Sequence, residues 1–342
     1  MERSMRIDNP CGIVNVYKEK GWTSFDVVAV MRRIFGLRRV GHCGTLDPFA
    51  EGVLPICLGR ATSIVRYTEQ YDKRYAVTIA FGQATDTQDL TGATIGGRTP
   101  SAEELDALAE NDWRKLRDLV ATLPGEHEQV PPMYSAVKVK GQPLYKYARR
   151  GETVERPARK IKIDHADIMA IHVTDGPTPL LVELDIGCSK GTYIRTIASD
   201  LGERLGFGAH AVRLVRTACG PYELKDSRTP DEVKQVLNDI KDARSLETGE
   251  GSAADHLILP IDSALDSYPV IELDANYSIK LLQGQTVKVP NDHFSDLTDV
   301  RLRANGPLGF LGVVVLKRQE SGDSVILAER MMADIDDYTT RF

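Results

Sequence analysis

A stretch from about Ser245 to Asp255 divides this chain, because it is rich in Gly, Ser and Glu and poor in large apolar residues. Such a composition cannot build a core, so we interpret it as a flexible linker or surface loop. The 342 residues are enough for one large or two medium domains, each with its own core. We therefore expect a large body over residues 1–245 and a small C-terminal domain over residues 257–342.

The large body is expected to mix helices and strands, as in the α+β class. Apolar runs, several of them alternating, predict strands over residues 12–17, 53–58, 74–81, 160–163, 167–173 and 180–186. Capping residues and apolar positions at helical spacing predict helices over residues 24–35, 101–122 (one helix or a pair), 192–205 and from 229 onward. The C-terminal part is predicted to be a small β-barrel-like module, with strand-like runs at 269–273, 285–289 and 312–317. We see no internal repeat.

Composition and motif content argue against several classes of protein. No apolar run approaches the roughly 20 residues of a membrane helix, and the N-terminal MERSMRIDNP lacks the apolar region of a secretion signal. We therefore expect a cytoplasmic protein. The five cysteines form no CxxC pair and the seven histidines show no HxxxH spacing, so we expect neither disulfides nor a metal site. The chain has no dinucleotide GxGxxG or phosphate-binding loop, and we expect no cofactor.

Charge is distributed unevenly along the chain. The formal net charge of −6 taken alone argues against a nucleic-acid partner. Between Lys138 and Lys162, however, there are nine Lys and Arg residues and only two acids, with tyrosines at 134, 145 and 147. A basic run is often only a solvated surface, but a run that also carries aromatic rings suits phosphates and bases. We expect this segment to contact RNA.

Two short segments carry candidate catalytic groups. The first, GHCGTLDPFA (residues 41–50), holds Asp47 between a glycine turn and a proline, with His42 five positions before it. A carboxylate in a stiff loop can present a reactive oxygen to a ligand, although Asp-Pro is also an ordinary turn. The second, CSKGTYIR (residues 188–195), places Arg195 four residues beyond a glycine turn. An isolated arginine there would usually be a surface charge of a helix.

Four segments resemble, in the same order, the TruB family of tRNA pseudouridine synthases: GHCGTLDPFAEGVLPICLGRAT, DKRYAVTIAFGQATDTQD, QVPPMYSAVKVKGQPLYKYARRG and CSKGTYIRTIASDLG. The similarity extends from Gly12 to about Tyr222, roughly two thirds of the chain. It implies a pseudouridine synthase fold, with a mixed, mainly antiparallel sheet, flanking helices and a tRNA-binding insertion at about 125–165. The tail from about Leu257 onward is more loosely similar to a PUA-like C-terminal RNA-binding domain.

The resemblance implies roles for individual residues. Asp47 matches the catalytic aspartate, and Arg195 the arginine that pairs with it. Tyr75 matches the tyrosine that stacks on the target base and has been proposed as a proton acceptor. His42 matches the histidine that fills the space left by the flipped nucleotide. Further substrate-binding residues, and no metal ligands, are expected at Gly44, Thr45, Leu46, Lys190, Tyr193, Lys18, Lys20, Tyr134, Lys138 and Arg149.

The resemblance also implies a reaction. The uridine at position 55 of tRNA, in the TΨC arm, would be flipped out and isomerised to pseudouridine without a guide RNA, metal or cofactor. The sequence does not show the oligomeric state, and we take a monomer as the default. Asp47 could attack C1′, stabilise an oxocarbenium-like state or assist proton removal from C2′, and the residues do not choose among these routes. An arginine beside a buried aspartate would keep it negative.

Two positions depart from the family pattern. Glu19 stands where the usual Lys-Pro-x-Gly motif has proline, and Ser63 stands where many members have the lysine of Ala-Thr-Lys. These departures bear on loop rigidity and a phosphate contact, and they leave the expected chemistry unchanged.

Three other functions fit parts of the same pattern. An RNA N-glycosylase cleaves the same bond, but its usual route needs two carboxylates, and only Asp47 has the required setting in the sequence. A non-catalytic RNA-binding or RNA-folding protein could use the same basic surface. A guide-RNA-dependent member of the superfamily is disfavoured, because the motifs, QVPPMYSAVKVKG among them, resemble the bacterial stand-alone type.

Overall fold

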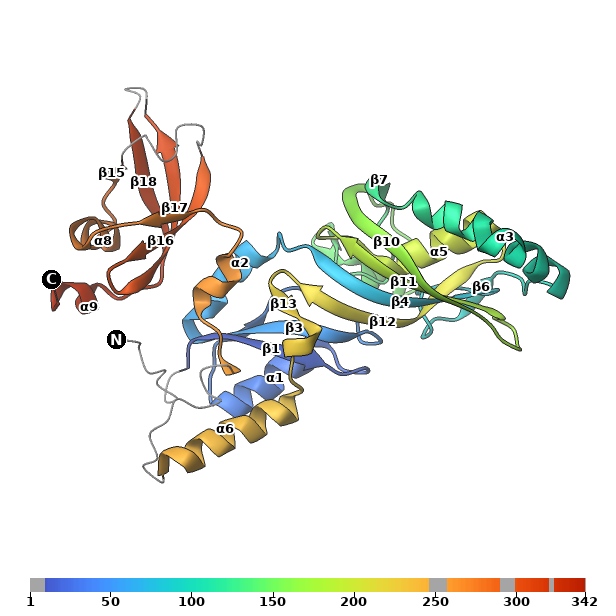
Figure 1. Cartoon of the computed structure of the whole chain (residues 1–342), viewed down its shortest axis with the longest axis horizontal. Coiled ribbons are helices and arrows are strands. Elements are labelled where there is room, and N and C mark those ends of the chain that lie inside the picture. Colours follow the sequence, from blue (N-terminus) through green and yellow to red (C-terminus); the bar gives the residue numbers. More distant parts are fainter. Residues whose placement is uncertain (1–9, 246–256, 290–298, 320–322, 342) are drawn as a thin grey trace.

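The computed structural model describes residues 10–245, 257–289, 299–319 and 323–341. Two large β-sheets frame them, one of nine strands and one of five. In Figure 1 the nine-stranded sheet runs through the middle of the molecule with helices against it, and the five-stranded sheet forms a unit at one end. Most of the predicted linker lies in residues 246–256, outside the described residues, so the linker stays a prediction.

The large sheet is mixed and mainly antiparallel, as expected. Its strands lie in the order β1 (Gly12–Lys18), β3 (Glu51–Leu58), β12 (Ala209–Cys219), β4 (Lys73–Phe81), β11 (Leu180–Cys188), β10 (Arg159–Val173) and β7 (Gly125–Gln129). Two short strands complete it, β2 (Val40–His42) on β3 and β13 (Tyr222–Glu223) on β12. Only the pairing of β3 with β12 is parallel. The α+β class is thereby confirmed.

One strand, β10, replaces the two strands predicted at 160–163 and 167–173. It pairs with β7 over Arg159–Ile163 and with β11 over Ile163–Val173, with register shifts in the β11 pairing between Ile163 and His165 and between Ile168 and Ala170. Each bulge interrupts the alternation of inward and outward residues. A continuous, bulged strand therefore looks like two strands in the sequence.

The sequence analysis missed β12, which lies in the centre of the sheet between β3 and β4. Its sequence AHAVRLVRTAC carries Arg213 and Arg216 among apolar residues, and its pairing with β4 contains two register shifts. Arg216 is fully buried. A buried cation reverses the usual rule that polar residues point outward, so the strand pattern is hidden.

The predicted helices are confirmed as α1 (Ser24–Phe35), α3 (Ala102–Ala121), α5 (Ile194–Leu205) and α6 (Pro230–Ser245). Thr23 and Asp26 form a reciprocal capping box at the start of α1, and Gly36 ends it in the left-handed conformation. The backbone of α3 is non-helical at residues 110–113, so α3 is two helical segments joined by a kink. This agrees with the predicted alternative of a helix pair. Among the described residues, no helix is long and apolar enough to cross a membrane.

The core of the large body lies between its sheet and these helices. Apolar residues of α1, α3, α5 and α6 join those of the central strands in one buried cluster. A second cluster includes Cys57 and Tyr71 from the sheet side and Leu265 from the short helix η3 (Ile261–Leu265). Residues just after 256 therefore pack on the large body, and Leu259 forms a backbone bridge with Ile13.

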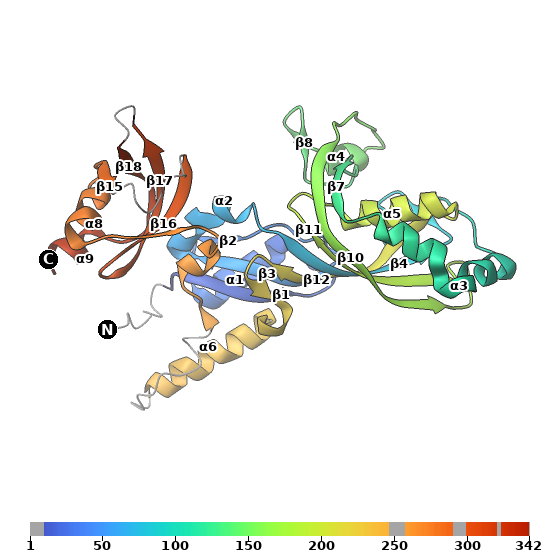
Figure 2. The ribbon, with the colours of Figure 1, turned by 45° about the horizontal axis from the view of Figure 1, so that its top comes forward.

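Short elements connect the main strands. They are η1 (Gly59–Ile64), α2 (Val65–Thr68), β5 (Ala84–Thr85), β6 (Thr94–Gly96), β8 (Lys138–Val139), β9 (Gln142–Pro143), α4 (Leu144–Ala148) and η2 (Leu224–Asp226). Figure 2 shows β8 and α4 projecting to one side of the sheet next to β7 and β10. We call residues 130–158, between β7 and β10, the arm. It lies within the predicted insertion at 125–165.

The C-terminal unit is β-rich, as predicted. Its sheet has the order β14 (Val270–Glu272), β16 (Val300–Gly306), β17 (Gly309–Arg318), β18 (Ser324–Met331) and β15 (Val287–Val289). Two helices, α8 (Ala275–Leu282) and α9 (Ile335–Thr339), accompany it. The predicted strands near 270, 287 and 314 are confirmed, and β16, β18 and both helices were not predicted. Most of its buried apolar residues form a separate core, while Val313 and Met332 join the second cluster of the large body.

The parallel contact between β3 and β12 depends on Gly52. This residue has φ +107°, and a Cβ atom on it would overlap the backbone oxygen of Arg216. We expect Gly52→Ala to lower the free energy of unfolding by about 2–3 kcal/mol or more, because it combines steric overlap with backbone strain. Urea denaturation measures this. Gly96→Ala, where a Cβ meets no atom within 4 Å, is the control and should change stability by less than about 0.5 kcal/mol; equal losses would contradict the argument.

Candidate active site

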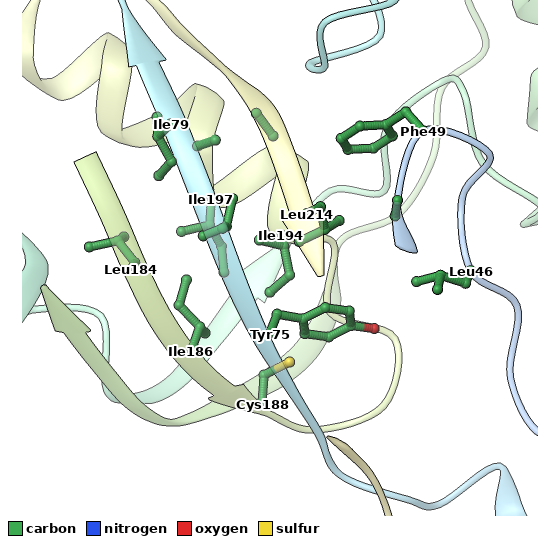
Figure 3. Close-up of a cluster of buried hydrophobic side chains, with 14 of the residues drawn as sticks. Leu46, Phe49, Tyr75, Ile79, Leu184, Ile186, Cys188, Ile194, Ile197 and Leu214 are labelled. Carbon is green, nitrogen blue, oxygen red and sulfur yellow. The ribbon is translucent and has the colours of Figure 1, made fainter. Parts of the chain in front are cut away.

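The loop between β2 and β3 (residues 43–50, the Asp47 loop) is held at its start and in its middle. Its first residue, Cys43, donates its backbone N–H to the oxygen of Pro55 at 2.9 Å. In its middle, the hydroxyl of Ser24 accepts from the N–H of Leu46 at 2.9 Å and donates to its carbonyl at 3.1 Å. Leu46 and Phe49 are buried, and Figure 3 shows both directed toward the cluster around β4 and β12. The loop is therefore a fixed support for Asp47.

Arg195 reaches Asp47 from the first turn of α5. Its Nε donates to Oδ2 of Asp47 at 2.8 Å. The arginine side chain is 3% exposed, whereas that of Asp47 is 33% exposed. The pair thus has a buried cation and a carboxylate that is open to a ligand on one side. Two residues that are 148 positions apart in the sequence meet as the sequence analysis predicted.

Three further groups fix the guanidinium independently of Asp47. Nη1 donates to the carbonyl of Thr87 at 2.7 Å, and Nη2 donates to the carbonyl of Tyr134 at 2.9 Å. Oδ2 of the buried Asp89 lies 3.5 Å from Nη1. Asp89 is itself held by the N–H of Thr91 at 2.9 Å. The positive charge therefore stays in place whether or not a ligand is present.

A cavity of about 520 Å³ opens beside this ion pair. It brings together eight of the predicted site residues, namely Gly44, Thr45, Leu46, Asp47, Tyr75, Lys190, Tyr193 and Arg195. Ser135 and Ala136 of the arm also line it. The amide of Gln129 accepts from the N–H of Tyr193 at 2.8 Å and donates to its carbonyl at 3.1 Å, which fixes the turn before α5. The volume suits one nucleoside-sized ligand.

Tyr75 forms an apolar floor for the cavity. Its side chain is 7% exposed, and Figure 3 shows its ring among Ile186, Ile194 and Leu214 with the hydroxyl directed toward the Asp47 loop. Burial raises the pKa of Tyr75 above its ordinary value, and the charge of Arg216 opposes part of that shift. The side chain is therefore a neutral phenol at physiological pH.

His42 lies at the end of β2, immediately before the Asp47 loop. Burial lowers the pKa of His42 below its ordinary 6.5, and the positive charge of Arg216 acts in the same direction. The imidazole is therefore uncharged at neutral pH. Its ring meets the ring of Phe25 edge to face, with centroids 6.1 Å apart.

Other predicted residues lie around the cavity rather than in it. Tyr134 contributes its carbonyl to Arg195, while its hydroxyl donates to Asp86 at 3.3 Å. Lys138 in β8 and Arg149 after α4 are exposed on the arm, and the guanidinium of Arg149 lies 5.5 Å from the ring of Tyr145. Lys20 is exposed beyond β1. None of these four side chains is among the cavity-lining residues.

Lys18 does not reach the surface. It is fully buried, and its Nζ donates to the carbonyls of Glu19, Trp22 and Ala50 at 3.0, 2.8 and 2.5 Å. These contacts use all three N–H bonds of the ammonium. Lys18 therefore fixes the end of the Asp47 loop, and the structure gives it no donor free for a ligand.

Arg216 was missed by the sequence analysis. It is fully buried and lies opposite Tyr75 in the β12–β4 pairing. Its guanidinium donates to the carbonyls of Val53 at 2.7 Å, Thr45 at 3.3 Å and Gly44 at 3.2 Å. Because β12 was not predicted, nothing in the sequence placed this arginine beneath the loop.

The cavity also has polar lining residues that the sequence analysis did not select, namely Thr68, Glu69, Lys73, Ser135 and Thr192. Arg159 and Lys160, from the basic segment expected to contact RNA, line it as well. Burial lowers the pKa of Lys73, whose ammonium also contacts the carbonyl of Tyr71 at 2.5 Å. Glu69 is an exposed second carboxylate at the rim. The cavity lining therefore contains a second acid, and the expectation that only Asp47 has the setting for catalysis stays a prediction.

One group of side chains has the composition of a metal site. Donor atoms of His165, Asp167 and Asp185 lie within 4.8 Å of one another. Asp185, however, accepts hydrogen bonds from Nε and Nη2 of Arg74. A cation already bound to the buried carboxylate disfavours a metal ion at the same place.

The chain is similar to a known enzyme family over most of its length. Residues 32–194 match the model of the TruB family pseudouridylate synthase (N terminal domain), and residues 195–266 match that of the tRNA pseudouridylate synthase B C-terminal domain. The tRNA pseudouridine synthase B of Halalkalibacterium halodurans is 36% identical over 323 residues, which cover 94% of this chain and 98% of the relative. That of Caldanaerobacter subterraneus subsp. tengcongensis is 37% identical over 309 residues, covering 90% and 96%.

Solved structures are similar at the level of the fold. A chain in the crystal structure of a Cbf5–Nop10–Gar1 complex aligns with a TM-score of 0.72 and 22% identity, covering 99% of this chain and 89% of that one. At this identity, the likeness concerns the arrangement of helices and strands. It agrees with the mixed sheet and the β-rich C-terminal unit described above.

The buried ammonium of Lys18 makes stability depend on pH. Burial lowers the pKa of Lys18 from 10.5 to about 8, and the charge of Asp47 opposes the shift. Between these values the unfolded chain holds a proton that the folded chain lacks, so the free energy of unfolding rises with pH. We expect this gain, relative to Lys18→Met, to reach about 3 kcal/mol. Urea denaturation of both proteins from pH 7 to pH 10 measures it, and parallel curves would refute the assignment.

Proposed function

The chain belongs to the TruB family of pseudouridylate synthases, and from that premise we propose that it modifies uridine 55, in the TΨC arm of tRNA. Membership of the family supports the coarser activity, the isomerisation of uridine to pseudouridine in tRNA. The choice of position rests on the resemblance of the motifs around Asp47 and Arg195. We place the reaction in the cytoplasm, with tRNA as partner and a monomer as the active form.

The observation that carries this proposal is the ion pair of Asp47 and Arg195 at the wall of the cavity. In the reaction the N1–C1′ bond breaks, the uracil turns, and a C5–C1′ bond forms. A proton leaves C5, and N1 ends with a proton, so product and substrate have the same composition. No oxidant, reductant or group donor enters this balance. The step needs a negative oxygen near the sugar, and Asp47 supplies one.

Arg195 gives Asp47 its direction. The Nε–H of the guanidinium donates to Oδ2 of Asp47 at 2.8 Å and so fixes the orientation of the carboxylate. The partly exposed oxygen atoms of Asp47 can then attack C1′, stabilise positive charge on the sugar or accept a proton from C2′. All three routes use the same carboxylate in the same position, and the proposal leaves them open.

Tyr75 and His42 are proposed to handle the flipped base. Rotating a base out of a folded loop costs a few kcal/mol, and stacking on an aromatic ring returns about 1–3 kcal/mol per base. Tyr75 can hold the extruded uracil, and the raised pKa of Tyr75 favours this stacking role over that of a proton acceptor. The uncharged ring of His42 can fill the space that the uridine leaves.

The arm and the C-terminal unit are proposed to bind tRNA outside the cavity. Exposed cations of the arm, Lys138 and Arg149 among them, can contact phosphates, and such contacts weaken with salt. We assign residues 1–245 to the catalytic domain, with the insertion at 125–165, and residues 257–342 to a PUA-like RNA-binding domain. Lys190 and Tyr193 at the cavity complete the proposed substrate contacts.

Asp47→Asn tests the proposed chemistry, because it keeps the size of the side chain and removes its charge. We expect binding of an unmodified tRNA transcript within about twofold of wild type, and loss of pseudouridine formation by at least about 10³-fold. Because pseudouridine and uridine have equal mass, the product is first treated with a reagent that adds selectively to pseudouridine, and mass mapping then locates the modified nucleotide. Asp106→Asn, on the exposed face of α3, is the matched control.

The outcomes of this experiment separate the alternatives. Product formation by Asp47→Asn at the wild-type rate would remove Asp47 from its role. Release of free uracil by wild type would favour the N-glycosylase, with Glu69 as the second carboxylate. A modified uridine outside the TΨC arm would contradict position 55 and leave the isomerisation intact.

Arg195→Lys tests whether the geometry of the guanidinium matters as well as its charge. Arg195 donates to Asp47, Thr87 and Tyr134 from three separate nitrogens of a planar group, and the single nitrogen of lysine cannot occupy all three positions. We expect kcat to fall roughly 10²-fold, because the carboxylate loses its orientation, with tRNA binding retained. Single-turnover kinetics measure this, with Arg114→Lys on exposed α3 as control. Activity equal to wild type would show that a positive charge alone suffices.

A further inference from the structure

Phe25 is the most exposed of the large apolar side chains in the described part of the chain. It is 73% exposed, and the other exposed apolar residues of this group are aliphatic. The other helix residues around it are used for packing or capping: Val27 and Val28 are buried, and Asp26 belongs to the capping box. A phenylalanine left in water at this position has no folding role that its contacts reveal. Its ring is therefore available for contact with a partner, and an aromatic face is suited to stacking.

The position of Phe25 is fixed relative to the Asp47 loop. The preceding residue, Ser24, exchanges two hydrogen bonds with the backbone of Leu46, which precedes Asp47. The ring of Phe25 also meets the ring of His42 edge to face, with an interplanar angle of 84°. Two elements, α1 and β2, thus present two aromatic rings at right angles immediately outside the loop.

The surroundings favour a flat, uncharged partner that is attached to negative charge. Phe25 itself offers only an aromatic face, which suits stacking. Arg38 and Arg39 are exposed just before β2, the strand that ends at His42. The carboxylate of Asp26 is occupied by the N–H and hydroxyl of Thr23, at 2.8 and 2.7 Å. A nucleobase on a phosphate backbone has this combination of properties.

We propose that Phe25 is a further RNA-binding residue, whose ring stacks on an unpaired base next to the uridine that enters the cavity. This proposal rests on the proposed function, since it takes the RNA loop to lie over the Asp47 loop. His42 and Phe25 then form one continuous surface: His42 occupies the space left by the flipped nucleotide, and Phe25 supports its neighbour. The arm contacts phosphates, whereas Phe25 contacts a base.

The test compares Phe25→Ala, Phe25→Leu and Phe25→Trp with wild type, using an unmodified tRNA transcript. We expect Phe25→Ala to raise KM about tenfold with kcat within about twofold, because a stacking contact of typical strength is lost. Phe25→Trp should restore KM, and Phe25→Leu should not. Met169→Ala is the matched control, since Met169 is 66% exposed on β10 and should leave KM unchanged.

Each outcome bears on one of the two claims. An unchanged KM in Phe25→Ala, or full rescue by leucine, would overturn the stacking role. The same substitutions in the Asp47→Asn protein, followed by RNA binding alone, test Phe25 without the reaction. If Phe25→Ala lowers the affinity of the Asp47→Asn protein for RNA, the contact is supported. Failure of the wild type to make pseudouridine would refute only the proposed function. Thermal denaturation should be the same for all three variants, because the side chain is exposed.

Discussion

The pairing of Asp47 with Arg195 is the interaction on which the rest of this structure depends. One partner stands in a loop near the start of the chain and the other begins a helix 148 residues later. They meet because β12, from late in the chain, inserts between β3 and β4, while α5 packs against β12 and β4. The order of strands in the sheet is thus what delivers the cation to the carboxylate. A change that shifts β12, as at Gly52, acts on the site as well as on stability.

Two buried cations support the Asp47 loop from below. Arg216 holds the carbonyls of Gly44 and Thr45 before Asp47, and Lys18 holds the carbonyl of Ala50 after it. Burying such charges is unfavourable unless hydrogen bonds and a nearby opposite charge compensate. Backbone carbonyls provide the hydrogen bonds, and Asp47 provides negative charge close to Lys18. The carboxylate that faces the ligand therefore also helps to stabilise the groups that position it.

The sequence predicted features that depend on neighbouring residues, such as helix caps. It failed where a charged residue is buried, because charged residues are expected at the surface. The capping box and the Gly36 terminus predicted α1 closely, because both are local. The motif resemblance predicted that Asp47, Tyr75 and Arg195 lie together, and all three line one cavity. It did not show that Lys18 is enclosed, since a lysine in a motif gives no sign of its burial. Arg216 was missed for a related reason. Its buried charge interrupts the alternating pattern of β12, so the strand was not predicted, and the same buried charge holds the Asp47 loop.

The guanidinium of Arg195 is held in place by more groups than Asp47 alone. Thr87, Tyr134 and Asp89 hold the guanidinium from sides that Asp47 does not occupy. A preformed charge of this kind stabilises a transition state without the cost of reorganising at the moment of reaction. One of these contacts comes from the arm, through the carbonyl of Tyr134. The arm, to which we assign tRNA contacts in the proposed function, therefore also helps to position the guanidinium that pairs with Asp47.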